Sequence, residues 1–80
     1  MNYIITYRSG IDCYPISIFI HEEHAADYNI TCEEDAVNMV LKYGNPAFHE
    51  VACKKTLLDY DSYIEDRDNI IIGMLNILDE

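Results

Sequence analysis

Two histidines stand close enough together to suggest a metal site. His21 and His24 are three residues apart in "HEEH", and the third histidine, His49, lies much further along the chain. A structural zinc ion takes four protein ligands and a catalytic one takes three, whereas local spacing fixes only two here. The simpler interpretation is a polar strand end that runs into a loop. We therefore expect no metal and no cofactor at these histidines.

Two aspartates begin a pattern that is typical of calcium-binding loops. Asp59 and Asp61 match the first and third positions of such a loop. The loop also needs an oxygen ligand at its fifth position, glycine at its sixth and glutamate at its twelfth. This chain has Tyr63, Ile64 and Ile70 at those positions. The calcium pattern is incomplete and predicts no bound ion.

A cysteine at the start of a predicted helix is the best candidate for a nucleophile. The helix dipole stabilises a thiolate at the position of Cys32. Three acidic residues follow it directly, and their charge disfavours a thiolate. No histidine is tied to Cys32 by spacing, and the chain contains neither a glycine-rich phosphate loop nor a GxSxG elbow. These features predict a protein that is not an enzyme.

The number and spacing of the cysteines and the length of the chain indicate what kind of protein this is. Cys13, Cys32 and Cys53 are odd in number and widely spaced, and no secretory signal precedes them. We therefore expect free thiols and a cytoplasmic location. The longest strongly apolar run, residues 70–72, is too short to cross a bilayer. Eighty residues are expected to form one domain.

The stretch "LLDYDSYIEDRD", residues 57–68, concentrates negative charge. It holds five carboxylates and one arginine. Acidic side chains at a helix start complement the helix dipole, which accounts for some of these residues but not for all. Asp61, Glu65 and Asp68 would share one face of a helix that starts near Ser62, where like charges repel one another. The excess favours a binding face, and a solvated helix start is the alternative.

The whole chain is acidic as well. Fifteen acidic residues against five basic ones leave a formal charge of −10. Direct binding of nucleic acid requires cations that replace the counterions of the phosphates, so this balance argues against it. An anionic membrane surface is disfavoured for the same reason. A strongly basic protein, by contrast, would be attracted.

We therefore predict a non-enzymatic binding protein that occupies the basic, nucleic-acid-binding surface of another protein. Carboxylates on a rigid helix can compete with phosphates for the same lysine and arginine side chains. Tyrosines between the charges would act as apolar anchors. The predicted contacts are Asp59, Tyr60, Asp61, Tyr63, Glu65, Asp66 and Asp68, with Glu33, Glu34 and Asp35 as a second patch.

In size and charge the chain resembles the small acidic inhibitors that bacteriophages encode, among them DNA mimics and anti-CRISPR proteins. This resemblance lies in composition, and it implies an inhibitor that acts in the host cytoplasm. The alternative is a small adaptor domain that recognises an ordinary protein through an apolar surface. In that case the acidity serves only solubility.

The first predicted element along the chain is a β-hairpin. Apolar side chains alternate over residues 3–7 and over residues 15–20, which is typical of strands. Helical spacing follows over 32–43. Thr31 and Glu34 form a capping box at the start of this helix, and Gly44 is placed to end it.

Further helices are predicted in the second half of the chain, where one segment fits either a helix or a strand. Residues 46–58 form a helix if Asn45 caps it and Pro46 takes its first position. The rival interpretation is a strand over "FHEVACK", residues 48–54. A last helix follows the acidic stretch. The predicted fold is α+β, a hairpin with two or three helices on one of its faces (ββααα), and the alternative is ββαβα.

The final helix is too apolar to be covered by one small core. Its apolar residues occupy most of its circumference, which is expected only for a helix enclosed on several sides. Pairing two copies of the chain would bury the surplus. We therefore predict a homodimer with Ile70, Ile72, Met74 and Leu75 in the interface.

Overall fold

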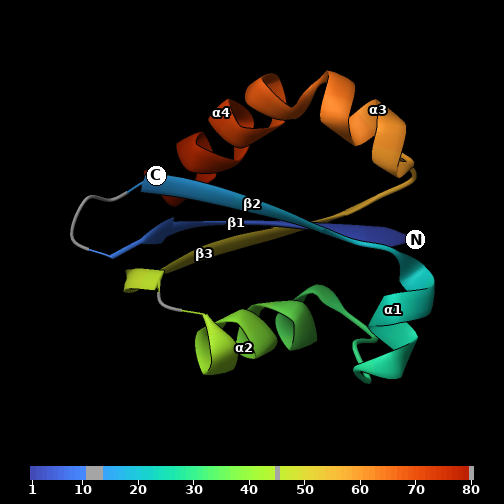
Figure 1. The fold of residues 1–80 in the computed structure, drawn as a ribbon. Coiled ribbons are helices and arrows are strands. Elements are labelled where there is room, and N and C mark those ends of the chain that lie inside the picture. Colours follow the sequence, from blue (N-terminus) through green and yellow to red (C-terminus); the bar gives the residue numbers. More distant parts are fainter. Residues whose placement is uncertain (11–13, 45, 80) are drawn as a thin grey trace.

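The computed structural model of the protein describes residues 1–10, 14–44 and 46–79. Within these residues, two strands are followed by two helices, a third strand and two further helices (Figure 1). The elements are β1 (Asn2–Ser9), β2 (Tyr14–Ile20), α1 (Glu22–Asp27), α2 (Glu33–Tyr43), β3 (Pro46–Thr56), α3 (Tyr60–Glu65) and α4 (Arg67–Leu78). The fold is α+β, as predicted, with the element order ββααβαα.

The sheet is built around β1, which pairs antiparallel with β2 on one side and with β3 on the other. Ile5 of β1 lies opposite Ile18 of β2 and Cys53 of β3. Every residue of β1 from Tyr3 to Tyr7 is buried, because both faces of this strand are covered. The predicted N-terminal hairpin is confirmed as β1 and β2.

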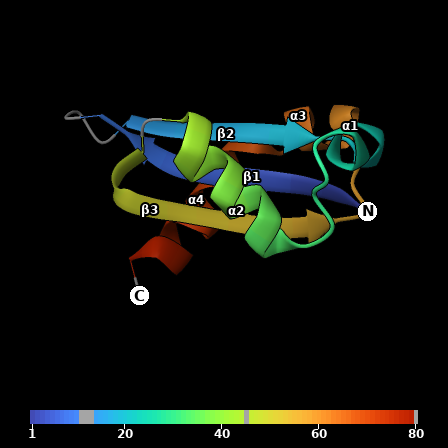
Figure 2. The ribbon, with the colours of Figure 1, turned by 90° about the horizontal axis from the view of Figure 1, so that it is seen from below.

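Helices cover both faces of the sheet and make a three-layer structure (Figures 1 and 2). On one face α1 and α2 close a core that includes Ile5 and Val40. On the other face α3 and α4 close a smaller core that includes Ile4 and Met74. The prediction that all helices share one face is wrong, because β1 carries apolar side chains toward both sides.

Residues 46–56 form β3, so the predicted second helix over 46–58 is wrong and Pro46 begins a strand. Val51 and Cys53 pack against the first core, and Ala52 lies in the second. A strand between two helix layers is apolar on both faces, so it lacks the apolar–polar alternation that marks an exposed strand. The alternative prediction of a strand over 48–54 is confirmed for this segment.

Two helices fill the segment between β2 and β3. α1 occupies residues that the sequence interpretation assigned to a loop, and α2 confirms the predicted helix over 32–43. The start of α2 differs from the predicted capping box. Asp35, rather than Glu34, accepts hydrogen bonds from the backbone N–H and the hydroxyl of Thr31, at 3.0 and 2.9 Å. Cys32 takes the N-cap position itself.

Gly44 ends α2, as predicted, but for a different reason. Its N–H donates to the carbonyl oxygen of Val40 at 2.7 Å. A Cβ atom at position 44 would lie 2.7 Å from that same oxygen. The backbone of Gly44 has φ −85°, outside the left-handed region. Close approach, and not a special backbone conformation, therefore requires glycine here.

The predicted last helix is divided in two. α3 ends at Glu65, and Asp66, with φ −112° and ψ 17°, separates it from α4. Met74 is buried against the sheet, with Ile70 and Leu78 packed beside it in the second core. The break lets α3 and α4 follow the surface of the twisted sheet as separate segments.

Candidate functional site

The topology brings helix starts together at one end of the molecule. β2 and β3 both finish beside the start of β1, so α1 and α3, which follow them, also begin there. The side chain of Asn2 joins the two regions. Its amide nitrogen donates to the carbonyl oxygen of Leu58 at 2.8 Å, and its Oδ1 accepts from the N–H of Glu22 at 2.9 Å. α2 starts in the same half of the molecule, nearer the middle of the sheet than α1 (Figure 1).

These helix starts carry much of the negative charge of the chain. Acidic residues occupy the first turns of α1, α2 and α3, where they complement the helix dipoles. Because α1 and α3 start at one end and α2 starts in the same half of the molecule, their carboxylates lie in that half. We call this region the acidic end and define it by the exposed residues Glu22, Glu23, Glu33, Glu34, Asp59 and Asp61.

Some of these carboxylates also hold the local structure. Oδ1 of Asp59 accepts from the N–H of Ser62 at 2.8 Å, and this backbone hydrogen bond lowers the pKa of Asp59. Glu22 pairs with the N-terminal ammonium at 2.8 Å, which lowers the pKa of Glu22. The backbone hydrogen bond from Thr31 likewise lowers the pKa of Asp35. These three groups are therefore ionised at neutral pH and committed to internal contacts.

The predicted acidic row is distributed over two helices. Asp61 and Glu65 belong to α3, whereas Asp68 lies in the first turn of α4, beyond the break. All three are exposed, as is Asp66, which accepts a hydrogen bond from the side chain of Asn69 at 2.8 Å. The continuous i, i+4, i+7 face expected from the sequence is therefore interrupted, although its members stay on one side of the sheet.

The second predicted patch lies on the other side of the sheet. Glu33, Glu34 and Asp35 belong to α2, which packs against the face opposite to α3 and α4. Glu33 and Glu34 are exposed and Asp35 is half-buried. The sheet therefore lies between the two patches, and they do not form one flat surface.

Only one of the two predicted tyrosine anchors is at the surface. Tyr60 is 57% exposed, whereas Tyr63 is 2% exposed. The Tyr63 ring stacks on Phe19 with ring centroids 5.2 Å apart, and its hydroxyl donates to Oγ of Ser17 at 2.6 Å. Tyr63 therefore holds α3 against β2, and Tyr60 alone is available as an aromatic contact beside the carboxylates.

The residues considered for metal binding have local roles instead. Nδ1 of His21 accepts from the N–H of Glu23 at 3.2 Å and caps α1, while Asp59 caps α3. Within residues 1–10, 14–44 and 46–79, no three His, Cys, Asp or Glu side chains come together as metal ligands. His49 has its side chain outside the described part of the structure.

The cysteines differ in their surroundings. Cys32 and Cys53 are free thiols, and Cys13 lies outside the described residues. Burial raises the pKa of Cys53 to about 11, and the charge of Glu33 adds to this effect. The thiol of Cys53 is therefore protonated at neutral pH and is a poor nucleophile.

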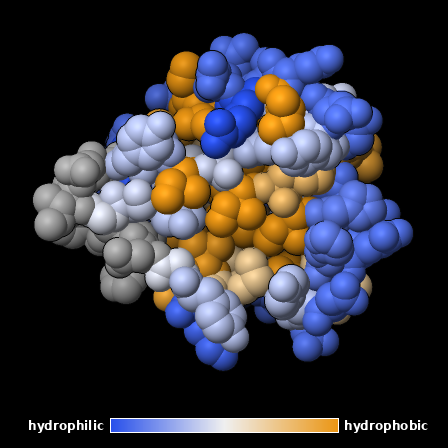
Figure 3. Space-filling model, in the orientation of Figure 1, coloured by the Kyte–Doolittle hydropathy of each residue, from blue (hydrophilic) through white to orange (hydrophobic). Residues whose placement is uncertain are grey.

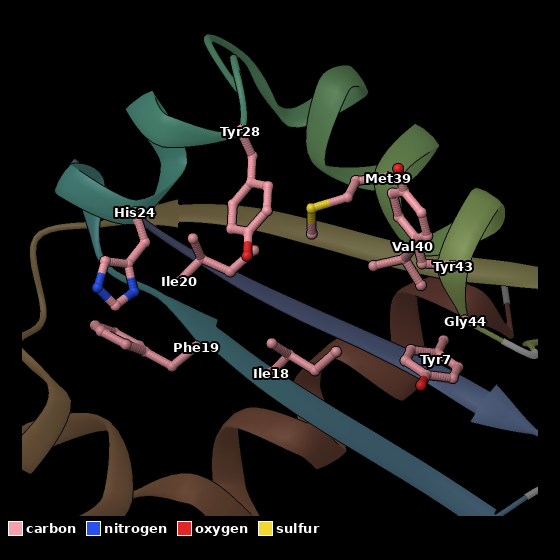
Figure 4. Close-up of a pocket in the computed structure, with 10 residues that line it drawn as sticks. All are labelled: Tyr7, Ile18, Phe19, Ile20, His24, Tyr28, Met39, Val40, Tyr43 and Gly44. Atoms are coloured by element: carbon pink, nitrogen blue, oxygen red, sulfur yellow. The ribbon is translucent and has the colours of Figure 1, made fainter.

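An apolar groove lies beside β2, on the face that α1 and α2 cover. α2 packs chiefly on β3 and β1, so the β2 side of this face is left open. The groove has a volume of about 590 Å³. Figure 4 shows Tyr28 and Met39 pointing into it from the helix layer, with Ile18 rising from β2. Its other lining residues include His24, Ile20, Val40 and Tyr43.

The sequence interpretation missed this groove, although a signal for it was present. The segment "YPISIFI" of β2 has no charged residue, which is unusual for a strand at the edge of a sheet. Figure 3 shows the result, with apolar residues across the middle of the face where β2 lies and hydrophilic ones at the end where α1 lies. The uncharged strand alone does not locate a groove, because the wall of the groove depends on where α2 packs.

The predicted dimer interface is partly inside the protein. Met74 is 2% exposed and packs against the sheet, while Ile70 and Leu75 are half-buried. Ile72 is 58% exposed, as is Ile77 on the same helix. Ile72 and Ile77 are therefore the α4 side chains that a second copy could reach.

In the described part of the chain, no helix combines the length and apolar character that a membrane span requires.

Comparison of the chain with models of protein families, with curated proteins and with solved structures gives no significant match. The acidic end and the groove beside β2 are two surface features of the described structure that could contact a partner.

Proposed function

We propose that this protein is a non-enzymatic acidic inhibitor that occupies the basic, nucleic-acid-binding surface of another protein. The observation that carries the proposal is the gathering of helix starts at the acidic end. It places exposed carboxylates from α1, α2 and α3 on one part of a rigid scaffold. A partner whose cations bind phosphates would meet them at that end.

The mechanism is competition for cations. A carboxylate accepts charge-assisted hydrogen bonds from lysine and arginine much as a phosphate does. The field of a body with charge −10 also accelerates its encounter with a basic surface. Arg8 of the protein is engaged by Glu50 and Asp79 away from the acidic end, and Lys54 and Lys55 near the end of β3 offset only part of the charge there.

The test is affinity capture from a bacterial lysate, with washes at low and moderate salt and elution by double-stranded DNA. Mass spectrometry identifies what each step releases. We expect nucleic-acid-binding proteins that DNA displaces and that moderate salt removes, because interactions between exposed charges are screened. Captured proteins that resist both salt and DNA would contradict the proposal.

Two matched variants locate the contact. Asp61→Asn, Glu65→Gln and Asp68→Asn together should weaken binding of the captured partner at least tenfold and leave the fold intact. Glu23→Gln, Glu33→Gln and Glu34→Gln remove the same number of charges on the α1 and α2 side. Because Glu23, Glu33 and Glu34 belong to the acidic end, the second variant should also weaken binding. No loss in it would exclude the α1 and α2 part of the acidic end, and no loss in the first would exclude the α3–α4 surface.

A second candidate function is an adaptor domain that binds an ordinary protein through its apolar surface. The groove beside β2 favours it, because protein–ligand sites are commonly concave and apolar with a few polar groups. The two functions differ in their response to salt. Binding through the groove alone would change little between low and moderate ionic strength.

A further inference from the structure

β2 is an edge strand that lacks the usual protection. β2 and β3 are the two edges of the sheet, in the order β2-β1-β3. β3 carries charged residues, Glu50, Lys54 and Lys55 among them, whereas β2 carries none. Exposed edges of natural sheets are normally blunted by charges, because their free N–H and C=O groups can pair with another chain. In β2 only Pro15, near its start, opposes such pairing.

The groove runs beside this edge and continues its apolar character. Ile18 and Ile20 of β2 form part of its floor, and Met39 and Val40 of α2 form part of its wall. Tyr28 and Tyr43 border it and are 66% and 75% exposed. Both are large aromatic residues that the fold itself leaves largely in water. An incoming strand could therefore find backbone partners and apolar side-chain contacts side by side.

We propose that β2 takes up an extended segment of a protein partner as a fourth strand, with alternate apolar side chains of that segment in the groove. In such β-augmentation the main-chain hydrogen bonds supply affinity, and the pockets for every second side chain supply specificity. Successive side chains of a strand point to opposite faces, so residues two apart along the segment would enter the groove.

The charge around the groove selects the kind of segment. α1 supplies His24 to one end of the groove and also carries the exposed carboxylates Glu23 and Asp27, whereas Lys42, near the end of α2, is an exposed cation. A second copy of this acidic chain is a poor match for this end of the groove, where the carboxylates of α1 favour a basic segment. The occupant is therefore a segment with lysine or arginine at the end that lies over α1. This part of the inference rests on the proposed function, which also requires a basic partner.

The probe for this inference is a phage-displayed library of random twelve-residue peptides, selected on the immobilised protein. We expect enriched peptides with apolar residues at alternate positions and lysine or arginine at one end. A synthetic copy of the strongest peptide should shift the backbone amide resonances of residues 14–20. Enrichment of acidic peptides, an absence of enrichment, or unchanged β2 resonances would overturn the proposal.

Matched variants distinguish the groove from other apolar surface. Tyr28→Ser with Tyr43→Ser should weaken peptide binding at least tenfold. Leu57→Ser with Ile72→Ser removes two exposed apolar side chains outside the groove and should leave binding unchanged. Equal effects of the two pairs would overturn the proposal. The proposal would also be wrong if sedimentation showed a dimer that only the Tyr28→Ser, Tyr43→Ser variant dissociates. A second copy of the chain would then be the occupant of the groove.

The peptide selection and the capture experiment can give different outcomes, so they test this inference and the proposed function separately. If no peptide is enriched but captured proteins are still released by salt and DNA, the acidic end acts without β2 and this inference is wrong. If peptides bind β2 while capture is insensitive to salt and DNA, the edge strand is a docking site and the proposed function is wrong.

Discussion

At the scale of single residues, side chains of types that often serve in catalytic or binding sites are used here to hold the fold. His21, Asp59 and Asp35 fix helix starts, and Tyr63 joins α3 to the sheet. Their residue types gave no indication of this, because capping and core contacts use the same donors and acceptors as binding sites. Two predictions belong to this scale.

Tyr63→Phe should destabilise the protein by about 1 kcal/mol and leave partner binding unchanged. The variant removes the hydroxyl that donates to Ser17 and leaves the stacked ring in place. Urea denaturation measures the change in the free energy of unfolding. Tyr60→Phe is the matched control, since the Tyr60 side chain is mostly exposed and its loss should cost less than about 0.5 kcal/mol. Equal costs would show that the hydroxyl of Tyr63 is not a structural contact.

The stability contributed by Asp59 should depend on acid pH. Its pKa is lowered in the folded protein, so its contribution is complete above the ordinary value of 3.8 and is lost as the pH falls through the folded pKa. Asp59→Asn keeps a capping oxygen, but it lacks the negative charge that complements the helix dipole and it does not titrate. The difference in melting temperature between parent and variant should therefore be greatest at neutral pH and shrink below pH 3.8. A difference that stays constant down to about pH 2 would contradict this assignment.

At the scale of elements, the sheet decides which face of each helix is buried. α4 is apolar around most of its circumference, yet only one side of it meets the sheet. Met74 packs there, and its sulfur accepts a hydrogen bond from the hydroxyl of buried Thr6 at 3.3 Å. Ile72 and Ile77 point away from the sheet and are exposed. Apolar residues of one helix thus differ in role, since Met74 belongs to the core whereas Ile72 and Ile77 lie at the surface.

Met74→Ala should destabilise the protein by about 2–5 kcal/mol, because it leaves a cavity and removes the partner of a buried hydroxyl. Ile77→Ala on the exposed side should change the free energy of unfolding by less than about 0.5 kcal/mol. Denaturation of both variants under the same conditions measures the contrast. Similar costs would mean that the two faces of α4 are not assigned correctly.

At the scale of the whole molecule, charge and apolar surface oppose each other. A charge of −10 keeps copies of the chain apart, while the exposed side of α4 favours their association. This side lies across the sheet from the groove beside β2. A homodimer through α4 and a partner strand on β2 are therefore compatible with one another.

The homodimer prediction is tested by sedimentation at micromolar concentration. We expect twice the monomer mass of 9.3 kDa, with association that tightens as salt screens the repulsion between copies. Ile72→Asp should give monomers, and Glu65→Gln, which leaves the apolar side of α4 intact, should not. A mass of 9.3 kDa at every salt concentration would exclude the dimer.

Local sequence patterns determined the elements that need little help from the rest of the chain. The hairpin of β1 and β2 and the helix α2 were predictable because alternation and helical periodicity report which side of a segment is buried. The acidity of the helix starts was also readable, since Glu33, Glu34 and Asp61 stand at the positions where a helix dipole favours them.

Only the tertiary structure decided the features on which function depends. β3 is a strand because β1 offers a second edge to pair with, and residues 51–53 contribute to the cores on both sides. The helix starts form one acidic end because β2 and β3 run in the same direction. The groove exists because α2 packs over β3 and β1 and leaves Ile18 only partly covered. Each of these outcomes follows from contacts between distant segments, which no local pattern of residues can specify.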